Sequence, residues 1–249
     1  MRAPQSPSAI RCRVLGRACL RGTAETIAQM RKKPIALGTR VQPATFLKHA
    51  DDQAVLGLNA VLEVIKNQSW EEHSFASWGV LAAPNFIGRA SIAQAIERFR
   101  IEGAWGVSPH LIPHQSLHAL SGTISQALAL HGPNFGVGGG PNSGPDAFLL
   151  AAALLGDVPG LWLVLTGHES EWIPAPNRAA PAPPCLAVAL ALTADVEAGA
   201  AALSIEPTSE AARSPEFRLE PFAHALQERS GRWRLAATHD LEYVAEMRG

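Results

Sequence analysis

Residues 136–144, GVGGGPNSG, form a glycine-rich turn between a short apolar segment and an apolar helical one. The first turn of a helix has free backbone N–H groups, which can bind an anion. The turn matches no common nucleotide or nucleophile motif. Gly136 and Gly138 fit the start of the dinucleotide motif G-x-G-x-x-G, but Pro141 stands where its third glycine should be. No Lys-Ser or Lys-Thr follows, as a P-loop would require. Ser143 is not framed as in the nucleophile motif G-x-S-x-G. Composition alone therefore favours a tight strand-to-helix crossing over a ligand site.

Three histidines, His110, His114 and His118, recur at every fourth position. On one continuous helix this spacing would place three imidazoles on a single face, as in a metal site. Pro113 disfavours a helix there, and no carboxylate lies nearby in the sequence. We therefore expect loop and helix-capping roles for these histidines, and no bound metal.

Two further polar groups could support catalysis. The sequence TGHESE begins at Thr166, directly after an apolar run, and it places His168 and Glu169 where α/β sheets usually hold their sites. The alternative is a polar turn that satisfies backbone groups. Ser143 and Asp146 lie one helical turn apart, but serine needs a base to become a nucleophile. A capping serine and an acid favoured by the helix dipole are the simpler roles.

The chain has 249 residues, a net charge of −1 and three cysteines. This balance predicts no electrostatic surface for nucleic acid or membranes. Residues 1–40 carry nine Arg or Lys and one acid, Glu25, which favours a solvated edge over a targeting segment. The longest apolar run, residues 148–155, is too short to cross a membrane. The cysteines show neither the spacing of a metal site nor that of a disulfide framework. We therefore expect the protein to lie in the reducing cytoplasm. We also expect no cofactor.

Hydrophobic periodicity predicts helices alternating with buried strands, which is typical of a layered α/β sheet. We expect residues 1–9 to be disordered and the proline-rich residues 173–184 to form an exposed loop. The expected strands are residues 10–20, 76–83, 134–138, 160–167, 185–193 and 200–207. The expected helices are residues 51–66, 91–102, 116–131 and 143–155, and the polar tail adds a helix at 219–230 and a strand at 232–237.

The order of these segments resembles the N-terminal half of the β-ketoacyl synthases, which have a thiolase-like fold. The matching segments, in chain order, are residues 43–65, 122–125, 131–133, 134–138, 143–155, 166–169 and 183–207. The similarity is greatest to short ketoacyl-synthase-like N-terminal proteins. It implies a thiolase-like layered α/β sheet, with a domain at residues 10–207 and a C-terminal extension at residues 208–249.

Two departures from this family bear on activity. The family has a nucleophilic cysteine at the start of the buried helix, where the helix dipole favours a thiolate. Pro141 holds that position here and cannot be acylated. The family's second half supplies two histidines, and the chain is too short to contain that half. His224 and His239 lie in the tail without the family's glycine-rich surroundings, so we transfer no role to them.

The resemblance therefore implies a non-condensing subunit, similar to a chain length factor, in fatty-acid or polyketide-type biosynthesis. It implies a homodimer or a heterodimer with a ketosynthase, and possible contact with an acyl carrier protein. Two alternatives remain open: an acyltransferase or thioester hydrolase that uses Ser143, and a non-catalytic module that binds an acyl chain or a carrier protein. The expected binding residues are those of the turn: Gly138, Gly139, Gly140, Asn142 and Ser143. Catalytic roles for Ser143 and His168 are weaker alternatives.

Overall fold

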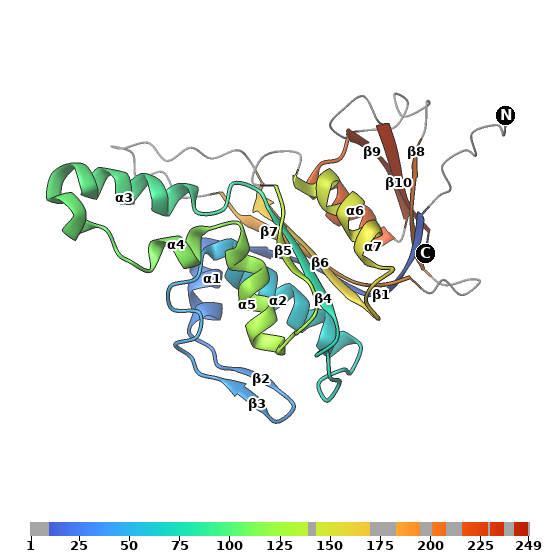
Figure 1. The fold of residues 1–249 in the computed structure, drawn as a ribbon, viewed down its shortest axis with the longest axis horizontal. Helices are drawn as coiled ribbons and strands as arrows, with labels where there is room; N and C mark the ends of the chain where they lie inside the picture. Colours follow the sequence, from blue (N-terminus) through green and yellow to red (C-terminus); the bar gives the residue numbers. More distant parts are fainter. Residues whose placement is uncertain are drawn as a thin grey trace.

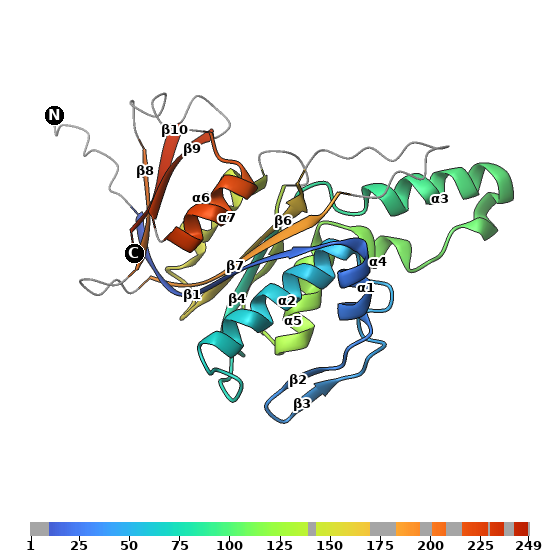
Figure 2. The same cartoon turned by 180° about the vertical axis from the view of Figure 1, so that it is seen from behind.

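The computed structural model describes residues 10–138, 143–169, 183–194, 201–207, 216–228, 230–236 and 242–248. Its centre is an eight-stranded sheet in the order β5-β4-β6-β7-β1-β8-β10-β9 (Figures 1 and 2). β4 pairs in parallel with β5 and β6, and the remaining neighbours are antiparallel. The strands of this sheet are β1 (Ile10–Gly22), β4 (Gly79–Pro84), β5 (Asn134–Gly136), β6 (Leu161–His168), β7 (Cys185–Thr193), β8 (Ala202–Pro207), β9 (Ser230–Ala236) and β10 (Glu242–Arg248). A separate hairpin pairs β2 (Ile35–Leu37) with β3 (Arg40–Gln42).

Helices cover both faces of the sheet, so the molecule has three layers. α1, α2 and α5 lie on one face, and α6 and α7 lie on the other (Figures 1 and 2). These helices are α1 (Ala24–Arg31), α2 (Asp52–Asn67), α5 (His118–Leu128), α6 (Ser143–Leu154) and α7 (Leu219–Glu228). No helix of the described residues is long and apolar enough to span a membrane.

The alternation of small and large residues in β7 explains how the layers pack. Ala187, Ala189 and Ala191 face the α2 side, and the leucines and valine between them face the α6 side. Successive side chains of a strand point to opposite faces. α2 packs on the alanine face, and its Gly57 lets α5 approach closely, because an added Cβ there would lie 2.6 Å from Leu120 Cδ1. Strand composition thus sets the spacing of the layer that positions the N-terminus of α2.

One segment projects from this body. It consists of α3 (Arg89–Glu102), the short 3₁₀ helix η1 (Gly103–Gly106) and α4 (Leu111–Gln115), and we call it the arm. No residue of α3 is buried, and Figure 1 shows α3 extending away from the sheet. α4 corrects one expectation, since Pro113 lies inside this short helix. Pro113 is in its first turn, where a missing N–H group costs no hydrogen bond.

The predicted α/β layering is confirmed, and each predicted strand and helix has a counterpart in the structure. The segments 134–138, 143–155 and 160–167 form a β-α-β connection, with β5 and β6 on either side of β4. Residues 208–249, which we described as an extension, supply α7, β9 and β10, and both strands join the central sheet. Residues 1–9 and most of the proline-rich stretch lie outside the described residues.

Candidate functional site

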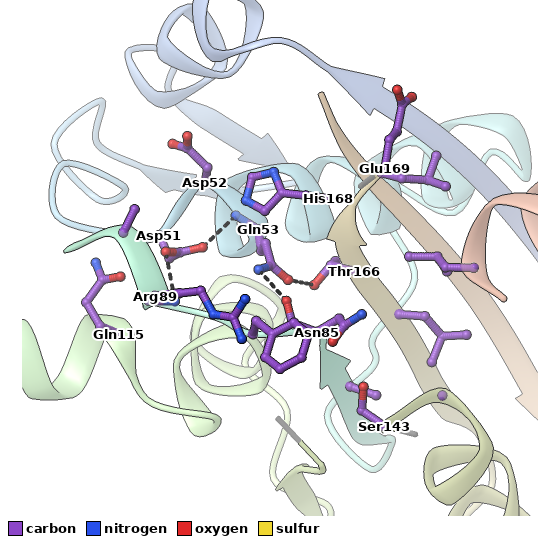
Figure 3. Close-up of a pocket in the computed structure, with 18 of the residues that line it drawn as sticks. Asp51, Asp52, Gln53, Asn85, Arg89, Gln115, Ser143, Thr166, His168 and Glu169 are labelled. Carbon is purple, nitrogen blue, oxygen red and sulfur yellow. Dashed lines mark hydrogen bonds between the residues drawn. The ribbon is translucent and has the colours of Figure 1, made fainter. Parts of the chain in front are cut away.

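A cavity of about 700 Å³ opens at the carboxyl ends of the parallel strands β4 and β6 (Figure 3). This is where ligands usually bind in open α/β sheets. Its walls come from the N-termini of α2, α3 and α6, the ends of β4 and β6, and the segment that leads into α7. Polar and charged groups from these elements converge on it, as Figure 3 shows for Asp51, Gln53, Asn85, Arg89, Thr166 and His168.

A buried hydrogen-bond network joins α2 to the two strand ends. The hydroxyl of Thr166 donates to Oε1 of Gln53 at 2.9 Å, and Gln53 Nε2 donates to the backbone oxygen of Asn85 at 2.9 Å. The Asn85 backbone N–H donates to the Thr166 backbone oxygen at 2.7 Å. Gln53 and Thr166 are both 1% exposed, so this network fixes the inner wall of the cavity.

Asp51 caps α2 and also holds the start of the arm. Its Oδ1 accepts from the Gln53 backbone N–H at 2.9 Å, and its Oδ2 accepts from the Gly88 N–H at 3.3 Å. Burial raises the pKa of Asp51, although the two backbone donors oppose that rise. A carboxyl group in this setting takes up a proton more readily than an exposed one.

Several other charges of the cavity are already paired. Arg31 forms an ion pair with Asp52, and Arg21 forms one with Glu169. The guanidinium of Arg89 lies over the ring of Phe86, 3.8 Å from the ring centroid. These contacts orient the charged side chains around the opening of the cavity.

The glycine turn contributes one edge of the cavity. Ser143 is the first residue of α6, is 3% exposed, and lines the cavity with Gly144. Gly138 has a φ of 85°, and an added Cβ would lie 2.2 Å from Ser143 Cβ, so this position requires glycine. The other predicted residues of the turn lie outside the described residues: Gly139, Gly140, Pro141 and Asn142.

The other predicted residues divide into two groups. His168 and Glu169 line the cavity, and His168 Nδ1 lies 3.0 Å from the Pro183 backbone oxygen. His118 begins α5 and lies 3.2 Å from the Ser121 hydroxyl, whereas His110 and His114 cluster with His49. Asp146 lies in the first turn of α6, as expected. Within the described residues, no three His, Cys, Asp or Glu side chains are arranged to hold a metal ion.

The three cysteines of the chain lie in the strands β1 and β7, and none lies in the segment that leads into α6. The Cys12 thiol donates to the Leu203 backbone oxygen, and the Cys19 thiol donates to that of Ala223. Burial raises the pKa of Cys12 to about 12, that of Cys19 to about 11, and that of Cys185 further still. A nucleophilic cysteine needs a lowered pKa, so none of the three is suited to carry an acyl group.

Sequence reasoning missed most of the polar lining. The pair Asp51 and Gln53 could have been found, because an aspartate directly before a periodic apolar helix is a typical N-cap. Asn85 and Gln115 carry no such signal. Each has a buried side-chain oxygen with no hydrogen-bond partner among the described residues, and each lines the cavity.

No family model and no curated protein matches the sequence. Solved structures with a similar fold include the ketosynthase ApeO in complex with its chain length factor ApeC from Xenorhabdus doucetiae. That match has 13% identity and a TM-score of 0.60, and covers 96% of this chain and 99% of the other. The ishigamide ketosynthase/chain length factor matches with 14% identity and a TM-score of 0.61, and the match covers 95% of this chain and 99% of the other. A third structure, AntDE:AntF, holds a type II polyketide synthase acyl-carrier protein in complex with its ketosynthase bound to the hexaketide. This match has 16% identity and a TM-score of 0.53, and it covers 79% of this chain and 68% of the other.

At these identities the similarity concerns the fold. Two of the three alignments extend over nearly the whole of both chains. The similarity of fold therefore includes the sheet, both helical layers and the elements around the cavity. The fold class that the sequence resemblance implied is therefore confirmed. The chain has the thiolase-like layered α/β fold of the ketosynthases and their chain length factors.

Proposed function

We propose that this chain is a non-condensing ketosynthase-like subunit that assists an active ketosynthase in acyl-chain assembly, in the manner of a chain length factor. The observation that carries this proposal is the absence of a usable thiol. The sequence has three cysteines, all of which lie in strands β1 and β7 of a ketosynthase-like fold: Cys12 and Cys185 are buried, and Cys19 is half-buried with a raised pKa. Condensation by this family needs a covalent acyl–cysteine, which this chain is not equipped to form.

The exposed apolar residues of the arm are evidence for a partner protein. Ile92, Ile96 and Phe99 follow one face of α3 at helical spacing, and their side chains are 40%, 56% and 56% exposed. Trp105 in η1 is 98% exposed. A helix of 14 residues that buries nothing is marginal in water, so contact with another chain would stabilise it. The strand β5, at the end of the sheet, adds the exposed side chain of Phe135.

The partner we propose is a ketosynthase, since the similar folds include ketosynthase–chain length factor assemblies. The test is co-expression with a ketosynthase from the same genome, followed by light scattering of the purified material. A stable heterodimer supports the proposal, and so does a change in product chain length when the subunit is added. A monomer that does not bind the ketosynthase contradicts the proposal.

Matched variants of α3 locate the contact. Ile96→Glu with Phe99→Glu places two charges on the apolar face, and we expect at least about a tenfold loss of heterodimer affinity. Gln94→Glu changes the opposite, exposed face of the same helix and should leave the affinity unchanged. Urea denaturation should give all these variants the wild-type free energy of unfolding within about 0.5 kcal/mol.

A second candidate function is binding of a carrier-protein arm without chemistry. The unpartnered amide oxygens of Asn85 and Gln115 call for a ligand with N–H donors, such as the amides of a phosphopantetheine group. Calorimetric titration with pantetheine tests this candidate, and Gln115→Leu should weaken the interaction. The Ser143-dependent hydrolase remains an alternative to both. Ser143→Ala would abolish thioester turnover under that alternative, and would change nothing under the other two.

A further inference from the structure

The arm joins the body at two points that lie beside each other. At the outgoing end, the Gly88 N–H donates to the Asp51 carboxylate. Gly88 has a φ of 73°, and an added Cβ there would lie 2.6 Å from the backbone oxygen of Gln115, at the returning end of the arm. Both ends of the arm therefore meet next to the segment that leads into α2.

Three imidazoles connect the returning end of the arm to this segment. His49, two residues before Asp51, stacks on His110 with ring centroids 4.7 Å apart and an interplanar angle of 6°. The His114 ring in α4 lies 5.9 Å from that of His49 and 6.2 Å from that of His110. One ring belongs to the body and two belong to the arm, so the cluster is a contact between them.

The charged groups around this cluster offer little negative charge that could stabilise protonated histidine rings. Of the nearby carboxylates, Asp52 is paired with Arg31, and Asp51 accepts from two backbone N–H groups. Lys48 precedes His49, and Arg89 at the start of α3 lies over Phe86, so both add positive charge. Burial lowers the pKa of His114, and the His49 and His110 rings lower it further. The arrangement shown by the structure thus favours a neutral His114 ring.

We propose that His49, His110 and His114 form a pH-sensitive latch, which holds the arm against the body while the rings are neutral and releases it when they are protonated. Histidine is the side chain whose ordinary pKa lies between pH 5 and 8, so release falls in the range from about pH 7 to 5. Protonation would place like charges on stacked rings whose centroids lie 4.7 Å apart. The latch concerns only the attachment of the arm, so it does not depend on which partner the arm binds.

Hydrogen exchange of the full chain, read by mass spectrometry at pH 7.5 and 5.5, tests the latch. After correction for the intrinsic exchange rate, we expect protection of peptides from residues 88–117 to fall at least about threefold at pH 5.5. The double variant His49→Phe, His110→Phe keeps a stacked pair without charge, and it should remove most of the fall. His224→Phe, an exposed histidine on α7, should behave as the wild type. An unchanged wild type, or an equal fall in the double variant, would overturn the proposal.

A second measurement needs no histidine variant. Two native cysteines are buried, and the third, Cys19, is half-buried with a raised pKa. Spin labels can therefore be directed to Ala104→Cys in η1 and Lys66→Cys in α2, both of which are exposed positions. We expect the distance distribution between the labels to broaden or shift as the pH falls from 7.5 to 5.5, and to recover on return. A distribution that stays narrow and fixed across this range would also overturn the latch.

Discussion

The Thr166 hydroxyl and the Gln53 side chain form a buried hydrogen bond of 2.9 Å that ties the end of β6 to the first turn of α2. Both partners are almost fully excluded from water. The inner wall of the cavity therefore depends on polar contacts whose loss leaves an unsatisfied group. Such a loss costs more than the net stabilisation of an average hydrogen bond.

Thr166→Val should lower the free energy of unfolding by about 1–3 kcal/mol, because Gln53 Oε1 then loses its donor. Urea denaturation measures this value. Adding Gln53→Leu should cost less than the sum of the two single variants, since both ends of one interaction are removed together. Strict additivity would mean that the two groups do not interact.

Gly136→Ala should destabilise the fold by about 1–3 kcal/mol or more. A Cβ at this position in β5 would lie 2.1 Å from the Leu117 backbone oxygen, and backbone cannot move aside cheaply. Gly156→Ala is the matched control, because a Cβ there meets nothing within 4 Å. Thermal unfolding should separate the two variants clearly, and equal melting temperatures would contradict this packing.

Asp51 should make stability depend on pH. Because its folded-state pKa lies above the ordinary carboxyl value, the folded protein takes up a proton before the unfolded chain does. Asp51 therefore reduces stability at neutral pH, and this penalty disappears as the pH falls through the raised pKa towards about 3.9. Asp51→Asn keeps a capping oxygen without the charge. The stability of the wild type relative to this variant should rise from pH 7 to pH 4.5, as measured by urea denaturation. A constant difference would argue against burial of the charge.

Thiol reagents should leave the folded chain unmodified. At pH 8 an exposed cysteine, with a pKa of about 8.5, reacts readily as its thiolate. Burial raises the pKa of all three native thiols, so mass spectrometry should detect labelling only after denaturant is added. Rapid labelling of one thiol in the native protein would reopen a catalytic role for cysteine.

Pro141→Cys should not restore condensation in the isolated chain. The resemblance places a cysteine at this position, and it implies that the two histidines of the ketosynthases come from a second half, to which none of the matching segments belongs. A radiolabelled malonyl condensation assay should give no product, even if the new thiol is acylated. Product above background would show that other groups can replace those histidines.

The sheet and α2 were predictable because their hydrophobic periods are strong. Val55, Leu58, Leu62 and Ile65 recur at helical spacing, and β7 is a continuous apolar run. α1 and β10 went unpredicted, since their polar residues mask the period. α1 depends on its Thr23 cap, and β10 is a strand because β8 and β9 pair with both of its edges.

The candidate site was predictable only in outline. The position of His168 after a buried strand and that of Ser143 at a helix start followed from local pattern. The stack of His49 on His110 did not, because it joins residues that are far apart in the sequence and depends on how the arm folds back. Tertiary contacts of this kind leave no periodic signal in a single chain.

The contact between Gly88 and Gln115 also has a consequence for how such a protein can diversify. Because the arm leaves and re-enters the body at one point, the segment between these residues behaves as an insertion in a closed loop. The entropy of closing a loop grows only slowly with its length. An arm of another length or sequence can therefore be exchanged as a cassette, and the surface offered to other chains can change while the sheet and cavity stay in place.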